Sequence, residues 1–301
     1  MTHISVLYQE VLDALNIEEN GRYIDGTLGA GGHTEGILQR GGRVLAFDWD
    51  PEAIAFAREK LASYGDQIQF ANASYAEMGT IAPQFGFEEV DGILMDLGLS
   101  SRQLDNPTRG FSFRYEAPLD MRFNQTRGRT AADLLNNLPE TALADIFWKY
   151  GDERQSRKIA RAIVSQRPLQ TTTQLASLVE GQIHHRRGRI HPATKIFQAL
   201  RIAVNGELEA LETGVTAAVE LLKSGGRIAV ISFHSLEDRF VKNYFRDLSK
   251  EPSWSVALPP DQTDWVQELN LVTRKPIMPT EAEIEENPRS RSARLRVAEK
   301  Q

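Results

Sequence analysis

Hydrophobic and polar positions alternate with two periodicities along the first hundred residues. Short apolar runs predict buried strands at 22–25, 43–48, 68–73 and 91–96. Between them, apolar residues recur at helical spacing and predict helices at 6–15, 33–39 and 51–64, with Pro51 at a helix start, where proline is tolerated. Short strands separated by helices of about 10–15 residues are typical of βαβ units and a parallel sheet.

The alternation of strands and helices stops after Ser101. Residues 105–128 are rich in Pro, Gly, Asn and Arg and predict an ordered loop. Only helical patterns follow, at 131–148, 155–167, 173–181 and 193–222. A buried strand at 225–234 and a helix at 237–248 restore the first pattern, and alternating segments at 269–274 and 293–298 predict a terminal antiparallel pair. The economical interpretation is a doubly wound domain, residues 1–104 and 206–301, interrupted by an inserted loop and helical domain, residues 105–205.

The charge distribution changes the expectation for the insertion. The whole chain carries a net charge of −6, which taken alone argues against a nucleic-acid partner. Residues 126–205, however, hold thirteen basic and six acidic residues, a net charge of +7 against −13 for the rest. One predicted helix face and one loop supply the RNA-contact candidates: Arg154, Arg157, Lys158, Arg161, Arg186, Arg187 and Arg189. We expect them to bind RNA phosphates, although a charged helix face is often only solvated.

Composition excludes several classes of protein and site. The chain has no cysteine, so it has no disulfide, thiolate metal site or cysteine nucleophile. The first ten residues lack the pattern of a signal peptide, and no apolar run approaches about 18 residues. We therefore expect a cytoplasmic protein with no membrane association. His184, His185 and His191 lack carboxylates at ligand spacing, and no metal is expected.

A glycine-rich segment, Asp25-Gly-Thr-Leu-Gly-Ala-Gly-Gly-His33, lies between the first strand and the next helix. Glycines there allow a tight turn and a close approach of a ligand to the helix N-terminus. Asp48 follows about twenty residues later, at the end of the second strand, where a ribose hydroxyl would bind. This spacing suits a dinucleotide or S-adenosylmethionine, and a glycine-rich turn without a ligand is the alternative. A Walker phosphate loop is disfavoured because no Gly-Lys-Ser/Thr is present.

Three features favour S-adenosylmethionine over a dinucleotide. The Asp25 carboxylate suits the ligand's ammonium group and would repel a pyrophosphate. Asp96-Leu-Gly-Leu-Ser-Ser101 forms a polar edge at the carboxyl end of the fourth strand, where ligands bind in such folds. The terminal alternating pair supplies the antiparallel edge that is typical of methyltransferases of this class.

Longer motifs carry a resemblance to a known family. They are Tyr23-Ile-Asp-Gly-Thr-Leu-Gly-Ala-Gly-Gly-His33, Asp91-Gly-Ile-Leu-Met-Asp-Leu-Gly-Leu-Ser-Ser101, Arg109-Gly-Phe-Ser-Phe113, Pro118-Leu-Asp-Met-Arg122, Ile231-Ser-Phe-His-Ser-Leu-Glu-Asp-Arg239, His191-Pro-Ala-Thr194 and Asn287-Pro-Arg-Ser-Arg-Ser292. Together they resemble the MraW (RsmH) family. The resemblance implies the class I S-adenosylmethionine-dependent methyltransferase fold, a Rossmann-like α/β fold with an antiparallel C-terminal edge. It also implies N4-methylation of a decoding-centre (P-site) cytidine in 16S rRNA, within the small ribosomal subunit.

The resemblance implies a cofactor site made of seven residues. The methionine part of S-adenosylmethionine would contact Gly31, Gly32 and His33, the ribose would bind Asp48, Tyr75 would lie beside the adenine, and the pocket would be completed by Asp96 and Gln103. The family often has Phe at the position of Tyr75. Without the resemblance, Tyr75 suits an ordinary core residue, Gln103 a helix cap or a solvent-facing residue, and Asp50 an alternative ribose ligand.

The acceptor base needs a second pocket. Many amino methyltransferases carry Asp/Asn-Pro-Pro-Tyr/Phe after the fourth strand, and this chain departs from that motif. The Asp96 carboxylate, the Leu97 carbonyl and Ser100 remain candidate acceptors for the amino group, with no general base assigned.

Two phenylalanines and a histidine complete the substrate-pocket candidates. A flipped base stacks on aromatic faces, which makes Phe111 and Phe113 candidates for a lid, or else for anchors of the loop in a core. His234 ends the fifth long strand and is the remaining candidate. We expect Ser235 and Asp238 to cap the next helix, and Asp120 and Arg122 to form an ion pair.

Two other functions fit part of this pattern. A nicotinamide-dependent oxidoreductase would use the same glycine turn, and a non-catalytic rRNA-binding assembly factor would keep an inherited cofactor fold. Asp25 beside a pyrophosphate disfavours the first, and loss of function on changing Asp96 would exclude the second.

Overall fold

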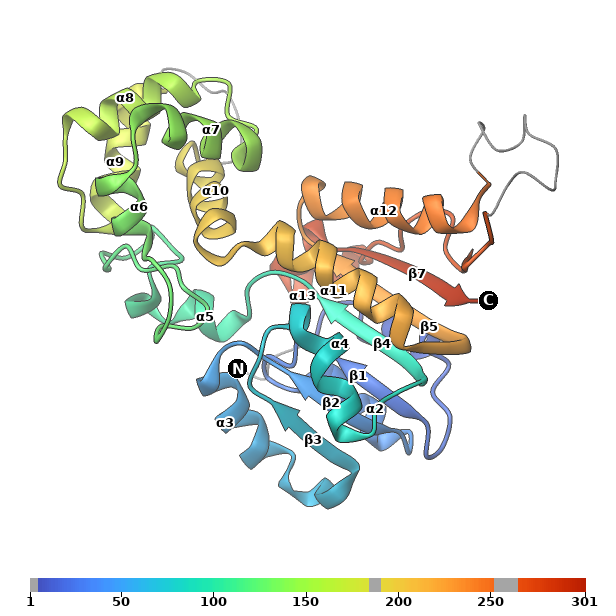
Figure 1. Ribbon diagram of the computed structural model, residues 1–301. Coiled ribbons are helices and arrows are strands. Elements are labelled where there is room, and N and C mark those ends of the chain that lie inside the picture. The colour runs from blue at the N-terminus through green and yellow to red at the C-terminus, as the bar shows by residue number, and fades with distance from the viewer. Residues whose placement is uncertain (1–4, 184–190, 252–264) are drawn as a thin grey trace. The chain divides into compact units, whose positions relative to one another are not determined.

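The computed structural model describes residues 5–183, 191–251 and 265–301 (Figure 1). The chain divides into two compact units, Met1–Gly98 with Ala210–Gln301, the sheet unit, and Leu99–Glu209, the helical unit. The second unit thus takes in Leu99 and the short helix after it, which the sequence pattern assigned to the first. Within the described residues, no helix combines the length and apolar character that crossing a membrane requires.

The sheet unit is built on seven strands in the order β3-β2-β1-β4-β5-β7-β6. Their bounds are β1 (Arg22–Asp25), β2 (Arg43–Phe47), β3 (Ile68–Ala71), β4 (Val90–Asp96), β5 (Leu222–Ser232), β6 (Leu269–Leu271) and β7 (Arg294–Lys300). β1 to β5 are parallel, whereas β7 pairs antiparallel with both β5 and β6. The predicted antiparallel edge is therefore present. The strand order reverses between β1 and β4, the point at which open α/β sheets bind ligands.

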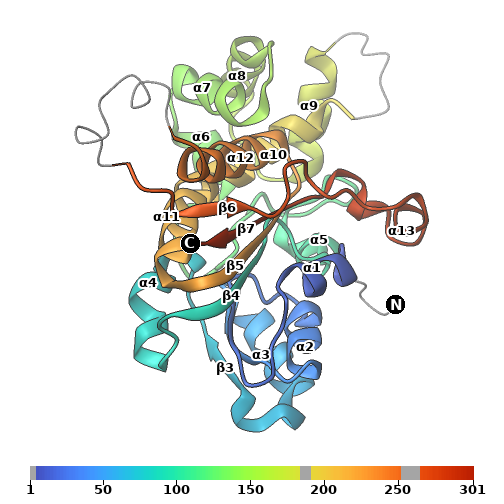
Figure 2. The ribbon, with the colours of Figure 1, turned by 90° about the vertical axis from the view of Figure 1, so that its right-hand side faces the viewer.

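Helices cover both faces of this sheet, as Figure 2 shows. One face packs against α1 (Tyr8–Ala14), α2 (Gly32–Gln39) and α3 (Pro51–Lys60), and the other against α4 (Met78–Ile81), α11 (Glu207–Leu221) and α12 (Ser235–Ser249). Tyr23 and Leu94 belong to the first core, and their chain neighbours Ile24 and Ile93 to the second. Successive strand residues point to opposite faces, so both faces of these short strands are apolar.

Short elements complete the sheet unit. They are α13 (Glu281–Glu286) and the 3₁₀ helices η1 (Ala62–Gln67), η2 (Tyr75–Glu77), η3 (Ala82–Phe85) and η6 (Pro288–Ser292). The predicted helix at 51–64 ends at Lys60, and its last turn belongs to η1.

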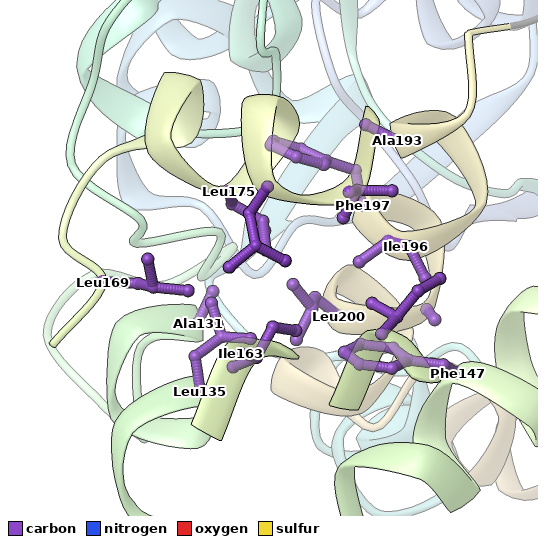
Figure 3. Close-up of a cluster of buried hydrophobic side chains, with 14 of the residues drawn as sticks. Ala131, Leu135, Phe147, Ile163, Leu169, Leu175, Ala193, Ile196, Phe197 and Leu200 are labelled. Atoms are coloured by element: carbon purple, nitrogen blue, oxygen red, sulfur yellow. The ribbon is translucent and has the colours of Figure 1, made fainter. Parts of the chain in front are cut away.

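The helical unit has an apolar core of its own (Figure 3). Its elements are α5 (Ser101–Asp105), η4 (Pro107–Arg109), α6 (Ala131–Asn137), α7 (Glu140–Gly151), α8 (Ser156–Ser165), α9 (Thr172–Gln182) and α10 (Ala193–Asn205). Phe147 of α7 and Leu200 of α10 are completely buried in this core.

Two predicted helices are each divided in the structure. The pattern at 131–148 forms α6 and α7, because Pro139 lacks the N–H that a continuous helix needs and stands at the N-cap of α7. The pattern at 193–222 forms α10 and α11, because Gly206 adopts a left-handed conformation (φ 59°) that ends α10. In both cases the apolar periodicity continues across the break, since both helices pack against a core.

Candidate cofactor site

The glycine-rich segment after β1 forms a tight loop that leads into α2. Gly29 (φ 52°) and Gly31 (φ 73°) adopt left-handed conformations that favour glycine. Gly31 is the N-cap of α2 and has no side chain that could cap this end. The first N–H groups of a helix have no partner within the helix. The loop thus presents the amides around Gly32 and His33 to an anionic group such as a carboxylate.

Asp25 lies at the start of this loop and binds the loop through its carboxylate. Its side chain is 1% exposed. Oδ1 accepts a hydrogen bond from the Thr27 N–H (3.0 Å), and Oδ2 accepts one from the Thr34 hydroxyl (2.6 Å). Burial raises the pKa of Asp25, against the effect of these bonds. Both carboxylate oxygens thus bind the loop and the start of α2, and contact of Asp25 with the ligand's ammonium stays a prediction.

Asp48 joins the end of β2 to the glycine loop. Its Oδ2 accepts from the Gly29 N–H and its Oδ1 from the Asp50 N–H, both at 2.8 Å. The pKa of Asp48 is raised to about 7, chiefly by burial and also by the charges of Asp50 and Asp25, against the lowering effect of the two N–H bonds. A half-buried carboxylate after the second strand suits the hydroxyl donors of a ribose.

Asp50, the alternative ribose ligand, has a different place. It is buried at the N-cap of α3, where its Oδ1 accepts from the Glu52 N–H at 3.0 Å. An Asp at this position stabilises a helix start. This contact accounts for Asp50 as a helix cap and leaves Asp48 as the candidate for the ribose.

Tyr75 begins η2, directly after the capping residue Ser74. Its ring packs against Gly214 of α11, where a Cβ atom would lie 2.5 Å from Tyr75 Cδ2. A Cβ on Gly26 would lie 3.2 Å from Tyr75 Cβ, so glycines adjoin the tyrosine on two elements. The sequence interpretation missed Gly214, although a glycine inside a strong helical pattern is a signal of close packing.

Asp96 ends β4 beside the glycine loop. Its backbone N–H donates to the Thr27 hydroxyl at 2.6 Å. Its Oδ2 lies 3.7 Å from Nδ1 of His33, and its Oδ1 is buried and accepts no hydrogen bond from the part of the chain that the structure describes. Burial, together with the charges of Asp25 and Glu237, raises the pKa of Asp96 to about 8. A buried carboxylate oxygen in this state suits a cationic or N–H-bearing ligand.

Gln103 and Ser100 lie in the helical unit and cap α5 together. The Ser100 hydroxyl accepts from the Gln103 N–H (3.2 Å), and Gln103 Oε1 accepts from the Ser100 N–H (3.1 Å). This is a capping box, and it confirms the alternative in which Gln103 caps a helix. Contact of Gln103 with the cofactor and of Ser100 with the substrate stays a prediction.

Phe111 and Phe113 both pack inside the helical unit. Phe111 belongs to the core, with its ring centroid 5.8 Å from that of Phe123. Phe113 is half-buried, 4.6 Å from the ring of His191 and 5.0 Å from that of Phe197. These contacts match the alternative in which the phenylalanines anchor the loop, and their stacking on a base stays a prediction.

Polar contacts order the rest of that loop. The predicted ion pair is confirmed, because Arg122 holds both oxygens of Asp120, with Nε 2.9 Å from Oδ1 and Nη2 2.8 Å from Oδ2. Burial alone would raise the pKa of Asp120, but the bonds from Arg122 outweigh it and hold the pKa below its ordinary value. Asn205 accepts from the Phe123 N–H and donates to the Met121 carbonyl. The sequence interpretation assigned no role to Asn205.

His234 is the N-cap of α12. Its Nδ1 accepts from the Glu237 N–H, and Glu237 Oε2 accepts from the Phe233 and His234 N–H groups. The predicted cap by Ser235 and Asp238 is wrong, since α12 begins at Ser235, one residue earlier than that pattern needs. Asp238 instead binds Arg294 and Arg296 of β7. Substrate contact by His234 stays a prediction beside this capping role.

The basic candidates of the helical unit fall into two groups. Arg154, Arg157, Lys158 and Arg161 are exposed, although Arg154 precedes the first residue of α8. Lys158 Nζ donates to the Gln182 carbonyl at 2.7 Å, and Arg161 lies 3.5 Å from Glu140. Arg186, Arg187 and Arg189 lie outside the described residues.

The sheet order, the antiparallel β7 and the glycine loop between β1 and α2 define a class I S-adenosylmethionine-dependent methyltransferase. The chain belongs to the MraW methylase family, whose model matches residues 1–301. It is 49% identical to a protein of Dehalococcoides mccartyi over 99% of this chain and 86% of that relative. The relatives from Geotalea uraniireducens (47%, 99% and 98% covered) and Thermomicrobium roseum (48%, 99% and 94% covered) are similarly close. All three are named ribosomal RNA small subunit methyltransferase H.

These findings confirm the family resemblance and the cofactor. The nicotinamide alternative is wrong, because the family consists of methylases. The residues of the sheet unit also fit S-adenosylmethionine. Amides at the start of α2 suit its carboxylate, and the acceptor oxygens of Asp48 suit its ribose hydroxyls. The buried Oδ1 of Asp96 suits its positive charge.

Proposed function

We propose that this protein transfers the methyl group of S-adenosylmethionine to N4 of a decoding-centre (P-site) cytidine of 16S rRNA, in the small ribosomal subunit. The observation that carries the proposal is the match over the entire chain to a methylase family whose relatives bear the name ribosomal RNA small subunit methyltransferase H. The choice of N4 and of the nucleotide rests on the resemblance of the sequence motifs. A cytoplasmic location follows from this substrate and agrees with the absence of cysteine.

The chain's own residues bind and orient the two reactants. S-adenosylmethionine supplies a methyl group activated by a sulfonium. The amides at the start of α2 and the Asp48 carboxylate would hold it at the carboxyl end of β1 and β2. Holding the acceptor nitrogen in line with the methyl group removes most of the entropic barrier.

The acceptor nitrogen needs help because its lone pair is delocalised into the cytosine ring. A carboxylate that accepts an N–H of the amino group stabilises the positive charge that develops there. Asp96 is the candidate with the most suitable atom, since its buried Oδ1 has no hydrogen-bond donor among the described residues. The Leu97 carbonyl and the Ser100 hydroxyl remain the other candidates.

The helical unit would bind the rRNA. Its sequence from 126 to 205 carries a net charge of +7, and the side chains of Arg154 and Arg157 are exposed. Exposed guanidinium groups contact phosphates and release counterions, which makes binding strong at low salt and independent of base sequence. The domain division at residues 105–205, with RNA binding assigned to the insertion, is part of this proposal.

The test is mass mapping of methylated nucleosides in 16S rRNA. Small subunits and free 16S rRNA, both from cells lacking the activity, are incubated with the protein and S-adenosylmethionine. We expect one N4-methylcytidine in the decoding centre. A methyl group at another atom or nucleotide would contradict the proposal. Methylation by the wild type that Asp96→Ala abolishes would exclude the non-catalytic assembly factor, and no methylation of either substrate would favour it.

A further inference from the structure

A histidine and a carboxylate meet where the glycine loop adjoins the end of β4. His33, which is 5% exposed on α2, places Nδ1 3.7 Å from Oδ2 of Asp96. Its Nε2 lies 3.0 Å from the Val6 carbonyl oxygen, and its ring stacks on Tyr8 with centroids 6.0 Å apart. The imidazole is thus held on two sides and turned with Nδ1 toward the carboxylate.

These contacts indicate how many protons the pair carries. A carbonyl oxygen only accepts, so Nε2 of His33 bears a hydrogen. If Nδ1 had no proton and Asp96 were ionised, a lone pair would face a carboxylate across 3.7 Å in a buried site, which is repulsive. The pair therefore holds one more proton, shared between His33 Nδ1 and Asp96 Oδ2.

The surroundings place this proton on Asp96 in the ligand-free protein. His33 lies in the first turn of α2, where the helix dipole disfavours a cation. Burial and the charges of Asp25 and Glu237 raise the pKa of Asp96 to about 8. Among the described residues, Asp25 of β1 and Glu237 of α12 act on Asp96 through their negative charges, and Tyr8 of α1 stacks on His33; none of these three groups is a cation.

We propose that His33 and Asp96 form a one-proton pair whose charge follows the charge on the ligand's sulfur. The pair gives up its proton when a sulfonium ligand binds and keeps it when the ligand is a neutral thioether. His33 is the positioning residue, since it acts by orienting and neutralising Asp96. This inference deepens the proposed function and rests on its cofactor, but not on the identity of the methylated nucleotide.

The proton count of methyl transfer agrees with this pair. The acceptor nitrogen forms a bond to the methyl carbon, the carbon–sulfur bond breaks, and its electrons stay on sulfur. The acceptor nitrogen then loses a proton, and the ionised Asp96 takes it up. One positive charge disappears from sulfur and one proton arrives on the pair, so the total charge in the buried site is unchanged.

Calorimetry on the intact protein tests the pair. S-adenosylmethionine and S-adenosylhomocysteine are each titrated at pH 7.0 in phosphate and in Tris, and the dependence of the binding enthalpy on buffer ionisation gives the protons released. The two ligands share their amino and carboxylate groups, so the difference between them isolates the sulfur charge. We expect S-adenosylmethionine to release about one proton more than S-adenosylhomocysteine.

Variants separate the pair from other sources of protons. Asp96→Asn should abolish the difference between the two ligands, and His33→Gln, which can still donate to the Val6 carbonyl, should reduce it. Asp13→Asn makes the same chemical change at an exposed carboxylate that binds Arg40, and should leave the difference intact. If His33→Gln fails to fold, the wild-type and Asp96→Asn titrations decide the question.

Two results would overturn the proposal. If both ligands bound tightly and released equal numbers of protons, the proposed proton pair would be contradicted and the proposed function would not be affected. A difference that persists in Asp96→Asn would assign the proton to another group. If neither ligand bound to the wild type, both the proposed function and the proposed proton pair would be contradicted.

Discussion

The sheet unit and the helical unit use charged side chains in opposite ways. In the sheet unit, Asp25, Asp48 and Asp96 lie at the carboxyl ends of β1, β2 and β4, and burial raises the pKa of each. In the helical unit, Arg154 and Arg157 are exposed to solvent above a core of apolar side chains. Carboxylates withdrawn from water form a site that distinguishes ligands by their charge at short range. Exposed cations instead bind anions with an affinity that depends on salt concentration. Changes in the two units should therefore have separable effects.

The largest effect is expected at Asp96. Asp96→Asn keeps the shape of the side chain but removes the carboxylate that would accept an N–H and a proton. We expect kcat for methyl incorporation into small subunits to fall by about 100-fold or more. Asp13→Asn is the matched control and should keep wild-type activity, because Asp13 lies on the surface with Arg40. An Asp96→Asn enzyme within a few-fold of the wild type would remove Asp96 from the chemistry.

Gly214 provides the next test of the sheet unit. Gly214→Ala places a Cβ 2.5 Å from Tyr75 Cδ2, so the tyrosine ring must shift. We expect the Kd for S-adenosylmethionine to rise about 10-fold and the free energy of unfolding to fall by about 1–3 kcal/mol. The control is Gly181→Ala in α9, where a Cβ lies within 4 Å of no atom of the described residues. That change should stabilise the protein by up to about 1 kcal/mol, and an equal response at both glycines would contradict the packing argument.

Substitutions in the helical unit should change the salt dependence of RNA binding and leave cofactor binding unchanged. Replacing Arg154 and Arg157 together by Gln should weaken binding to small subunits several-fold. It should also lower the slope of log K against log salt by about 1–2, if each guanidinium contacts one phosphate. The Kd for S-adenosylmethionine should stay at its wild-type value. Arg43→Gln, at an exposed arginine of β2, is the control. An unchanged salt slope in the double variant would mean that this face is only solvated.

The smallest effect concerns stability and pH. The pKa of Asp96 is about 8 and that of Asp48 about 7 in the folded protein, both above the ordinary value of 3.8. The folded state therefore binds more protons than the unfolded state between about pH 4 and 8. The contribution of these groups to stability is present at low pH and is lost as pH rises through 7 and 8. Urea unfolding at pH 5.5 and 8.0 should show this loss, and Asp96→Asn should show less of it.

The sheet unit could largely be predicted from the sequence because its signals are local. The apolar run from Arg22 to Asp25 indicates a strand, and the glycines from Gly26 to Gly31 indicate a turn, from consecutive residues alone. The position of Asp48 after β2 follows from the same alternation. The orientation of Asp25 could not be predicted, since its hydrogen bond to Thr34 depends on how α2 packs over the loop.

The ends of two helices and the contacts of the loop in the helical unit could not be predicted, because they do not follow from a local pattern. Its apolar periodicity continues through Pro139 and Gly206, and only the backbone of those two residues divides the helices. The anchoring of the loop by Asn205 joins residues that are more than eighty positions apart in the chain. Such contacts leave no local pattern. Gly214 and Tyr75 are a similar case. The glycine within a helical pattern and the aromatic residue after β3 can each be recognised in the sequence, but the contact between them cannot.

A crystal structure with S-adenosylmethionine bound would show whether the carboxyl ends of β1, β2 and β4 form the cofactor site. We expect ribose hydroxyls within hydrogen-bond distance of Asp48, the adenine beside Tyr75 and the sulfonium facing Asp96. A cofactor bound elsewhere, with Asp48 still bonded only to the amides of Gly29 and Asp50, would contradict this expectation.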